Sequence, residues 1–179
     1  RPFTHGRPLP VWSNLGTSEE LRVRFAYAFN PPQKGGGVPK IQLAVIPSAG
    51  VRVGSLFVRP IPVLPGILEI LGYRVGSFAY LTDCSGIPDA SLPLLQGVKT
   101  LIIDGLRKTP HPTHFSIAQA AQAARSIGAR EAWLIHLCHE SFHAELEAYC
   151  ETLSGGGLTL RPAWDGLELD IGGGENAAE

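Results

Sequence analysis

The sequence predicts a layered α/β domain, and three observations support this fold class. Probable strands follow one another through much of the first half of the chain. In the second half, apolar strand-like runs alternate with two segments of helical periodicity, as in strand–helix units. Apolar residues make up 44% of the 179 residues and charged residues only 17%, a balance typical of a globular chain.

The first half combines one expected helix with several strands. A loop at the start leads into a short strand, and Thr17 and Glu20 then form a capping-box pattern. This pattern predicts a helix over residues 17–29, which a proline pair ends. Strands are expected next over residues 41–46, 51–56 and 57–64. Two prolines in the last of these indicate an edge or irregular strand.

The second half has clearer punctuation. Strands are expected over residues 73–75, 78–81, 99–103, 131–135, 158–160 and 167–171. Ser116 should cap an amphipathic helix that reaches Ile127 and closes at Gly128. A second helix is expected over residues 141–153. The segment 172–179 is predicted to be a frayed, flexible tail.

The composition limits the kind of protein. Residues 1–171 are expected to form one domain, because the length suits a single hydrophobic core. The net charge of −1 gives no sign of nucleic acid or an anionic membrane as a partner. No apolar run approaches the roughly 20 residues of a membrane-spanning helix. Three cysteines fit a reduced, cytoplasmic protein better than a disulfide scaffold. The chain begins at Arg1 and contains no methionine, which predicts a processed chain or a fragment.

Residues able to bind a metal ion or a proton follow three apolar strands directly. Asp83, Asp104 and His136 each stand at the carboxyl end of a predicted strand. Ligands of α/β sheets bind at such ends, because the loops diverge there. An aspartate after a strand can instead form a turn or cap a helix, and for Asp104, which precedes Gly105, the two interpretations weigh equally. For Asp83 and His136 together a functional role is favoured.

The stretch PHPTHFS places two further histidines on a stiff loop before a helix. His111 and His114 could bind an anion there, and His114 could protonate a leaving group. A local capping or packing role for His114 is equally compatible with this spacing. In IHLCHESFH, His139 is expected behind the ligands or at the helix cap, and His143 on the helix surface.

A metal site and cysteine catalysis are competing interpretations of these residues. Imidazole and carboxylate suit zinc, manganese or iron, but a four-coordinate site with one open position needs three protein ligands. Cys84 and Cys138 lie beside the candidate ligands, yet partners on one local segment have poor geometry for a Cys–His dyad. Each cysteine is better explained as a small packed residue. The glycine-rich pieces lack the lysine and the context of a nucleotide loop.

The segments LGYRVGSFAYLTDCSGIP, IIDGLRKTPHPTHFS and LIHLCHESFH resemble the carboxyl-terminal half of metallo-β-lactamase-fold hydrolases. They are most similar to the cyclic-phosphate phosphodiesterases of the carbon–phosphorus lyase pathway and their relatives. The resemblance implies an αββα sandwich with two divalent ions, zinc or manganese, at its edge. It implies that Asp83 bridges the ions, that His136 is a terminal ligand, and that His114 contacts the phosphate. A metal-activated hydroxide then attacks phosphorus.

The chain departs from this family in two places. The motif His-x-His-x-Asp-His is absent from the 179 residues and is expected just before Arg1, in roughly 70–80 further residues of a complete domain. Relatives usually carry a histidine where this chain has Pro65, whose side chain cannot coordinate a metal.

These patterns together predict a metal-dependent hydrolase of phosphodiesters or cyclic phosphates with a small phosphorylated substrate. The chain alone is expected to be weak or inactive, and the sandwich left incomplete at its amino terminus could associate as a homodimer. The alternative is a degenerate family member that serves as a binding or structural module, which Pro65 favours. A free-standing doubly wound domain that binds a small anion at residues 105–116 is less compatible with the β-rich first half.

Overall fold

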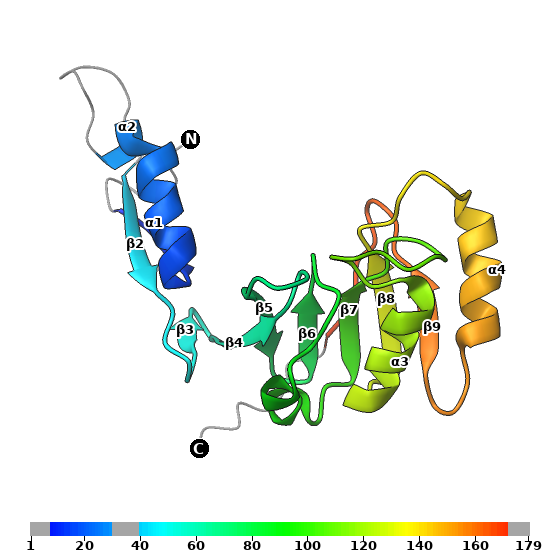
Figure 1. Ribbon diagram of the computed structural model, residues 1–179. Helices are drawn as coiled ribbons and strands as arrows, with labels where there is room; N and C mark the ends of the chain where they lie inside the picture. The colour runs from blue at the N-terminus through cyan, green and yellow to red at the C-terminus, as the bar shows by residue number, and fades with distance from the viewer. Residues whose placement is uncertain (1–7, 30–39, 172–179) are drawn as a thin grey trace. The chain divides into compact units, whose positions relative to one another are not determined.

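The computed structural model describes residues 8–29 and 40–171, which contacts group into two compact units divided after Ser48 (Figure 1). The single domain expected from the length therefore stays a prediction. The segments 1–7, 30–39 and 172–179, including the predicted frayed tail, lie outside the described residues.

The first unit is a strand–helix–strand arrangement. Strands β1 (Leu9–Ser13) and β2 (Ile41–Val45) pair in parallel, and helices α1 (Leu15–Arg24) and α2 (Ala26–Phe29) lie between them in sequence. The capping box predicted at Thr17 is wrong. The N-cap is Asn14, whose side-chain oxygen accepts from the Thr17 backbone N–H at 2.7 Å. The single helix predicted to reach residue 29 is also interrupted, because Phe25 leaves helical geometry.

The second unit contains a seven-stranded sheet in the order β3-β4-β5-β6-β7-β8-β9. The strands are β3 (Val51–Val53), β4 (Leu56–Val63), β5 (Ile70–Val75), β6 (Phe78–Leu81), β7 (Thr100–Asp104), β8 (Glu131–Ile135) and β9 (Thr159–Pro162). Strands β3 to β6 pair antiparallel, and β6 to β9 pair in parallel. Four parallel carboxyl ends therefore meet at one edge of the sheet.

Two strand predictions need correction. A turn at Gly54 separates β3 from β4, so the first strand is shorter than the predicted 51–56. Because β3 reaches only Val58, the rest of β4 has a single partner strand, and Pro60 and Pro62 lie in that edge-like part. The strand predicted over 167–171 is absent, since its alternating apolar side chains line a cavity against the sheet instead of pairing with a strand.

Helices α3 (Ile117–Ile127) and α4 (His143–Leu153) cover the β7–β9 region (Figure 1). Ser116 caps α3 in a capping box, and Gly128 ends it with φ of 82°, as the sequence predicted. Helix α4 begins two residues later than predicted. The side chains that face the helices alternate along the strands and are fully or almost fully buried, namely Ala79, Leu81, Leu101, Ile103, Ala132 and Leu134. Two short 3₁₀ turns, η1 (Asp89–Ser91) and η2 (Pro93–Leu95), follow β6.

Candidate metal and phosphate site

The candidate site lies where the loops leave the carboxyl ends of β6, β7 and β8 (Figure 1). Asp83 comes two residues after β6, Asp104 is the last residue of β7, and His136 directly follows β8. His114 lies in the loop from β7 to α3. The parallel pairing of these three strands brings four candidate residues that are far apart in the sequence to one sheet edge.

Three of these side chains converge on one point. The Asp83 Oδ1 atom lies 3.0 Å from His136 Nε2, and the rings of His114 and His136 stack with centroids 4.5 Å apart. Asp83, His114 and His136 each offer one donor atom within 4.8 Å of the others. Within residues 8–29 and 40–171 no other group of three histidine, cysteine or acidic residues comes together in this way.

The backbone is strained at two of these residues. Asp83 has φ of 56° and His136 has φ of 60°, and no other non-glycine residue in the described part of the chain has positive φ. The left-handed conformation costs an L-residue about 1–2 kcal/mol. Strain of this kind collects at functional sites, because only the surrounding structure can hold it. The fold thus keeps these two side chains directed at each other at a cost in stability.

The donors are accessible to ligands. The side chain of Asp83 is 51% exposed and that of His136 is 40% exposed, whereas His114 is only 17% exposed. A carboxylate and two imidazoles are a suitable donor set for zinc, manganese or iron, and small side-chain shifts would let one ion take two or three of them. The described residues therefore fit one divalent ion. They do not supply the further donors that a second, bridged ion requires.

Asp104 contacts His114 from the protein interior. Its carboxyl group is fully buried, and Oδ2 lies 2.6 Å from His114 Nδ1 and 3.0 Å from the Cys84 backbone N–H, which donates to it. Burial raises the pKa of the Asp104 carboxyl, and the hydrogen bonds from His114 and Cys84 oppose that rise. Asp104 is thus neither a surface turn former nor a helix cap.

Cys84 is chemically inert in this environment. Its side chain is fully buried, and burial together with the charges of Asp104 and Asp83 raises the pKa of the thiol to about 12. A thiol that stays protonated near neutral pH is a poor nucleophile. This environment agrees with the sequence interpretation of Cys84 as a packed residue.

The other sequence-predicted histidines lie around this centre. The His111 ring lies 5.1 Å from the His114 ring, and its Nδ1 accepts from the Thr113 backbone N–H at 3.4 Å. His139 is exposed and outside the group of three donors. His143, at the start of α4, pairs with Glu147 at 3.5 Å on the surface.

Ser85, which no motif in the sequence indicates, joins three segments around the site. Its hydroxyl accepts from the Gly66 backbone N–H at 3.1 Å and lies 3.3 Å from the carbonyl oxygens of Leu64 and Pro112. Leu64 also pairs with Gly86 through backbone hydrogen bonds. Pro65 is therefore held beside the loop that carries Asp83. Only the position of Ser85, two residues after Asp83, could have indicated this role.

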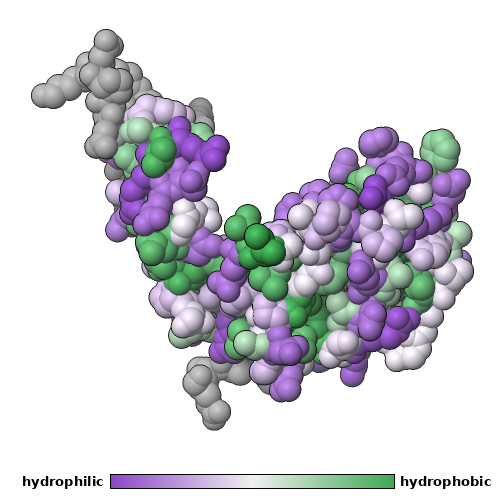
Figure 2. All heavy atoms as spheres, in the orientation of Figure 1, coloured by the Kyte–Doolittle hydropathy of each residue, from purple (hydrophilic) through white to green (hydrophobic). Residues whose placement is uncertain are grey.

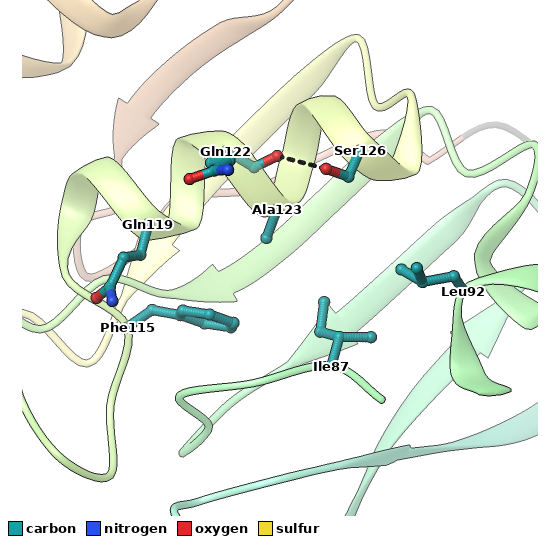
Figure 3. Close-up of a pocket in the computed structure, with 7 residues that line it drawn as sticks. All are labelled: Ile87, Leu92, Phe115, Gln119, Gln122, Ala123 and Ser126. Atoms are coloured by element: carbon teal, nitrogen blue, oxygen red, sulfur yellow. Dashed lines mark hydrogen bonds between the residues drawn. The ribbon is translucent and has the colours of Figure 1, made fainter. Parts of the chain in front are cut away.

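Two cavities of the second unit lie away from the three donors. One, of about 260 Å³, is formed between α3 and the segment after β6 (Figure 3), and its lining consists of Ile87, Leu92, Phe115, Gln119, Gln122, Ala123 and Ser126. The other, of about 410 Å³, lies under residues 163–171. Neither is lined by Asp83, His114 or His136, and the exposure of Asp83 and His136 shows that the donors form an open site at the sheet edge.

The geometry agrees with a comparison to known protein families. Residues 1–137 match the family model of the beta-lactamase superfamily domain. The chain belongs to this superfamily. It is thus a hydrolase-like member with the metallo-β-lactamase fold, in agreement with the αββα family predicted from its motifs.

Several solved structures are similar to this chain. A diphosphatase of the PhnP family is 32% identical, with a TM-score of 0.79 over 93% of this chain and 59% of that one. Zinc-bound PqqB from Methylobacterium extorquens has a TM-score of 0.67 at 15% identity, covering 93% of this chain and 66% of that one. The human short-form tRNase Z has a TM-score of 0.62 at 14% identity, over 94% of this chain and 70% of that one. The last two share the fold alone.

One relative is named as an acyl transferase rather than as a hydrolase. An octanoyltransferase of Porphyromonas gingivalis strain W83 is 35% identical over 170 residues, which are 92% of this chain and 33% of that protein. The chain therefore spans a third of that relative and about three fifths of the diphosphatase.

Proposed function

We propose that the chain is a metal-dependent hydrolase of phosphodiesters or cyclic phosphates and that its substrate is a small phosphorylated molecule. The observation that carries this proposal is the convergence of Asp83 Oδ1 and His136 Nε2 at 3.0 Å, with His114 stacked on His136. The 32% identity to a PhnP-family diphosphatase adds support for chemistry at phosphorus. Octanoyl transfer is not proposed, because the chain spans only a third of the relative with that name.

Each residue has a separate task in this proposal. Asp83 and His136 would hold a divalent cation, zinc or manganese, and the resemblance implies two such ions in a complete family site. A bound cation polarises the phosphoryl group and activates water. His114 directs Nε2 at the phosphate and, when both ring nitrogens carry a proton, gives a hydrogen bond or a proton to the leaving oxygen. His111 binds the substrate from the same loop. His139 and Asp104 do not bind the metal and instead hold the site residues in position.

The test combines metal content with turnover. The chain is stripped with a chelator, loaded with Zn²⁺ or Mn²⁺, and analysed for bound metal and for hydrolysis of bis(p-nitrophenyl) phosphate and a 2′,3′-cyclic nucleotide. With the donors of the described residues alone, we expect no more than one ion per chain and weak turnover. Asp83→Asn and His136→Ala should abolish both, whereas His143→Ala, a matched surface histidine, should change neither. Metal binding and turnover that survive in Asp83→Asn would contradict the proposal.

A degenerate member that binds without catalysis is the second candidate. Pro65 favours it, since the backbone holds this residue beside the Asp83 loop and its side chain offers no donor atom. Tight binding of inorganic phosphate without any turnover, in a metal-loaded chain, would support this alternative over the hydrolase.

The cellular setting is also a proposal. The three cysteines are free, which supports a reducing compartment such as the cytoplasm. Among the described helices, none is both long and apolar enough to cross a membrane. The net charge of −1 supports a small substrate rather than nucleic acid or a membrane surface.

We further propose that the chain forms a homodimer. Apolar patches interrupt the polar surface of the second unit (Figure 2), and Ile67 and Phe142 are 98% and 81% exposed. Sedimentation of the purified chain over a range of concentrations tests this proposal, and a monomer at all concentrations would contradict it.

A further inference from the structure

Asp104 is the most deeply buried charged group of the site, and its hydrogen bonds are few and specific. Its Oδ2 atom lies 2.6 Å from His114 Nδ1 and accepts from the Cys84 N–H at 3.0 Å, while Oδ1 has no hydrogen-bond partner. A buried carboxylate needs such donors, because water cannot reach it. The contact with His114 is thus a main source of its stabilisation.

This contact determines what His114 can offer to the site. An ionised carboxylate only accepts hydrogen bonds, so the proton between the two groups must sit on His114 Nδ1. In the neutral ring the other nitrogen, Nε2, then has a free lone pair. The partner of one ring nitrogen sets the state of the other. Nε2 is the nitrogen left free for substrate or metal beside Asp83 and His136.

We propose that Asp104 is a positioning residue that fixes His114 in the Nδ1–H form and directs its Nε2 toward the Asp83–His136 pair. The inference rests on the proposed function, in which His114 meets the phosphoryl group. Asp104 touches neither substrate nor metal and acts only through His114. Cys84 contributes through its backbone, because its N–H holds the same carboxylate oxygen in place.

The rest of the local structure supports this assignment. The His114 ring is held on two sides, by His136 at 4.5 Å and by His111 at 5.1 Å between centroids. The adjacent Phe115 N–H donates to the Cys84 carbonyl at 2.8 Å, which ties the His114 loop to the segment that binds Asp104. The ring therefore has little freedom to turn its nitrogens around.

Nuclear magnetic resonance measures the proton position directly. A two-bond ¹H–¹⁵N spectrum of the metal-free chain at pH 8 separates Nδ1–H from Nε2–H imidazoles, and His114→Gln assigns the signal. We expect His114 as the Nδ1–H form, while His143, which lies on the surface outside the site, serves as an internal reference. A His114 signal of the Nε2–H form, or an equal mixture of the two forms, overturns the proposal without any change to Asp104.

Asp104→Ala provides the second arm. Alanine removes the acceptor of the Nδ1 proton, so His114 should no longer be fixed in the Nδ1–H form, while the His143 signal stays the same. A His114 ring that is still entirely in the Nδ1–H form in a folded Asp104→Ala chain contradicts the proposal. In a chain that turns over substrate, kcat should fall on the order of 100-fold or more with little change in KM, because no carboxylate then orients the ring or stabilises its doubly protonated form.

The two readouts separate this inference from the proposed function. An Nδ1–H signal in a chain without hydrolysis counts against the hydrolase and leaves the role of Asp104 intact. Full hydrolysis in Asp104→Ala counts against the role of Asp104 and leaves the hydrolase intact.

Discussion

The positive φ angles at Asp83 and His136 predict that a glycine variant is more stable than an alanine variant at these positions, the reverse of the usual order. Replacing His136 by glycine or by alanine removes the same imidazole, with its contacts to Asp83 and His114, so their difference isolates the backbone term. Alanine at φ of 60° bears the left-handed cost of about 1–2 kcal/mol, which glycine avoids. Glycine loses about 0.5–1 kcal/mol through its greater freedom in the unfolded chain. We therefore expect His136→Gly to be more stable than His136→Ala by about 0.5–1 kcal/mol.

The assay is urea unfolding of the metal-free chain, followed by tryptophan fluorescence, to which Trp133, buried on β8, contributes. Unfolding midpoints are compared between variants whose unfolding free energy depends equally steeply on urea concentration, since an altered slope indicates a changed unfolded or native state. Ala148 is a matched control on the exposed face of α4, where glycine should be less stable than alanine by about 1 kcal/mol. The same pair of substitutions at Asp83 should repeat the inversion. If the alanine variant is as stable as the glycine variant, or more stable, at both positions, the backbone of Asp83 and His136 is not strained.

Three further predictions concern the core, the metal and pH. Gly105→Ala should lower the free energy of unfolding by about 1–3 kcal/mol, because its Cβ would lie 2.8 Å from a methyl carbon of the fully buried Leu134. In urea unfolding, an additional Leu134→Val should recover part of this loss. Strictly additive effects of the two substitutions would contradict the clash. Pro65→His should raise Zn²⁺ affinity in isothermal calorimetry, because it adds a donor beside the Asp83 loop, and an unchanged affinity would show that this position does not reach the metal. Burial raises the pKa of the Cys150 thiol to about 11, so the folded chain keeps a proton that the unfolded chain loses above pH 9. The free energy of unfolding should then fall as pH rises from 9 to 11, with a smaller fall in Cys150→Ala.

Elements with strong local signals were predictable from the sequence. Strand β8 has the predicted bounds, since its apolar run ends sharply at His136. Helix α3 has the predicted cap at Ser116 and stop at Gly128, because a hydroxyl and a residue free to adopt positive φ satisfy the helix ends locally. At the start of α1 the prediction was wrong, because two neighbouring residues could each cap the helix. Asn14 caps α1 three residues before the Thr17 pattern, and asparagine is preferred over threonine at the N-cap.

The site was predictable in composition but not in its internal order. The rule that parallel strands present their carboxyl ends together brought Asp83, Asp104 and His136 to one edge correctly. No periodicity indicates that Asp104 would turn inward and bond to His114, since that contact depends on the path of the nine residues between them. The left-handed backbone at Asp83 and His136 was likewise invisible, because neither residue type requires positive φ.

The loops around the site are joined by their backbones, and this has a consequence for metal binding. The Phe115 N–H donates to Cys84 O at 2.8 Å, and the Cys138 N–H donates to Leu106 O at 2.9 Å. These bonds connect the loops after β6, β7 and β8 in pairs, and none of them involves a candidate ligand side chain or requires an ion. The arrangement is therefore built by the chain itself, as a preorganised site should be. Weak metal retention would then reflect too few donor atoms rather than misplaced loops, and a donor added at position 65 would meet a scaffold already in place.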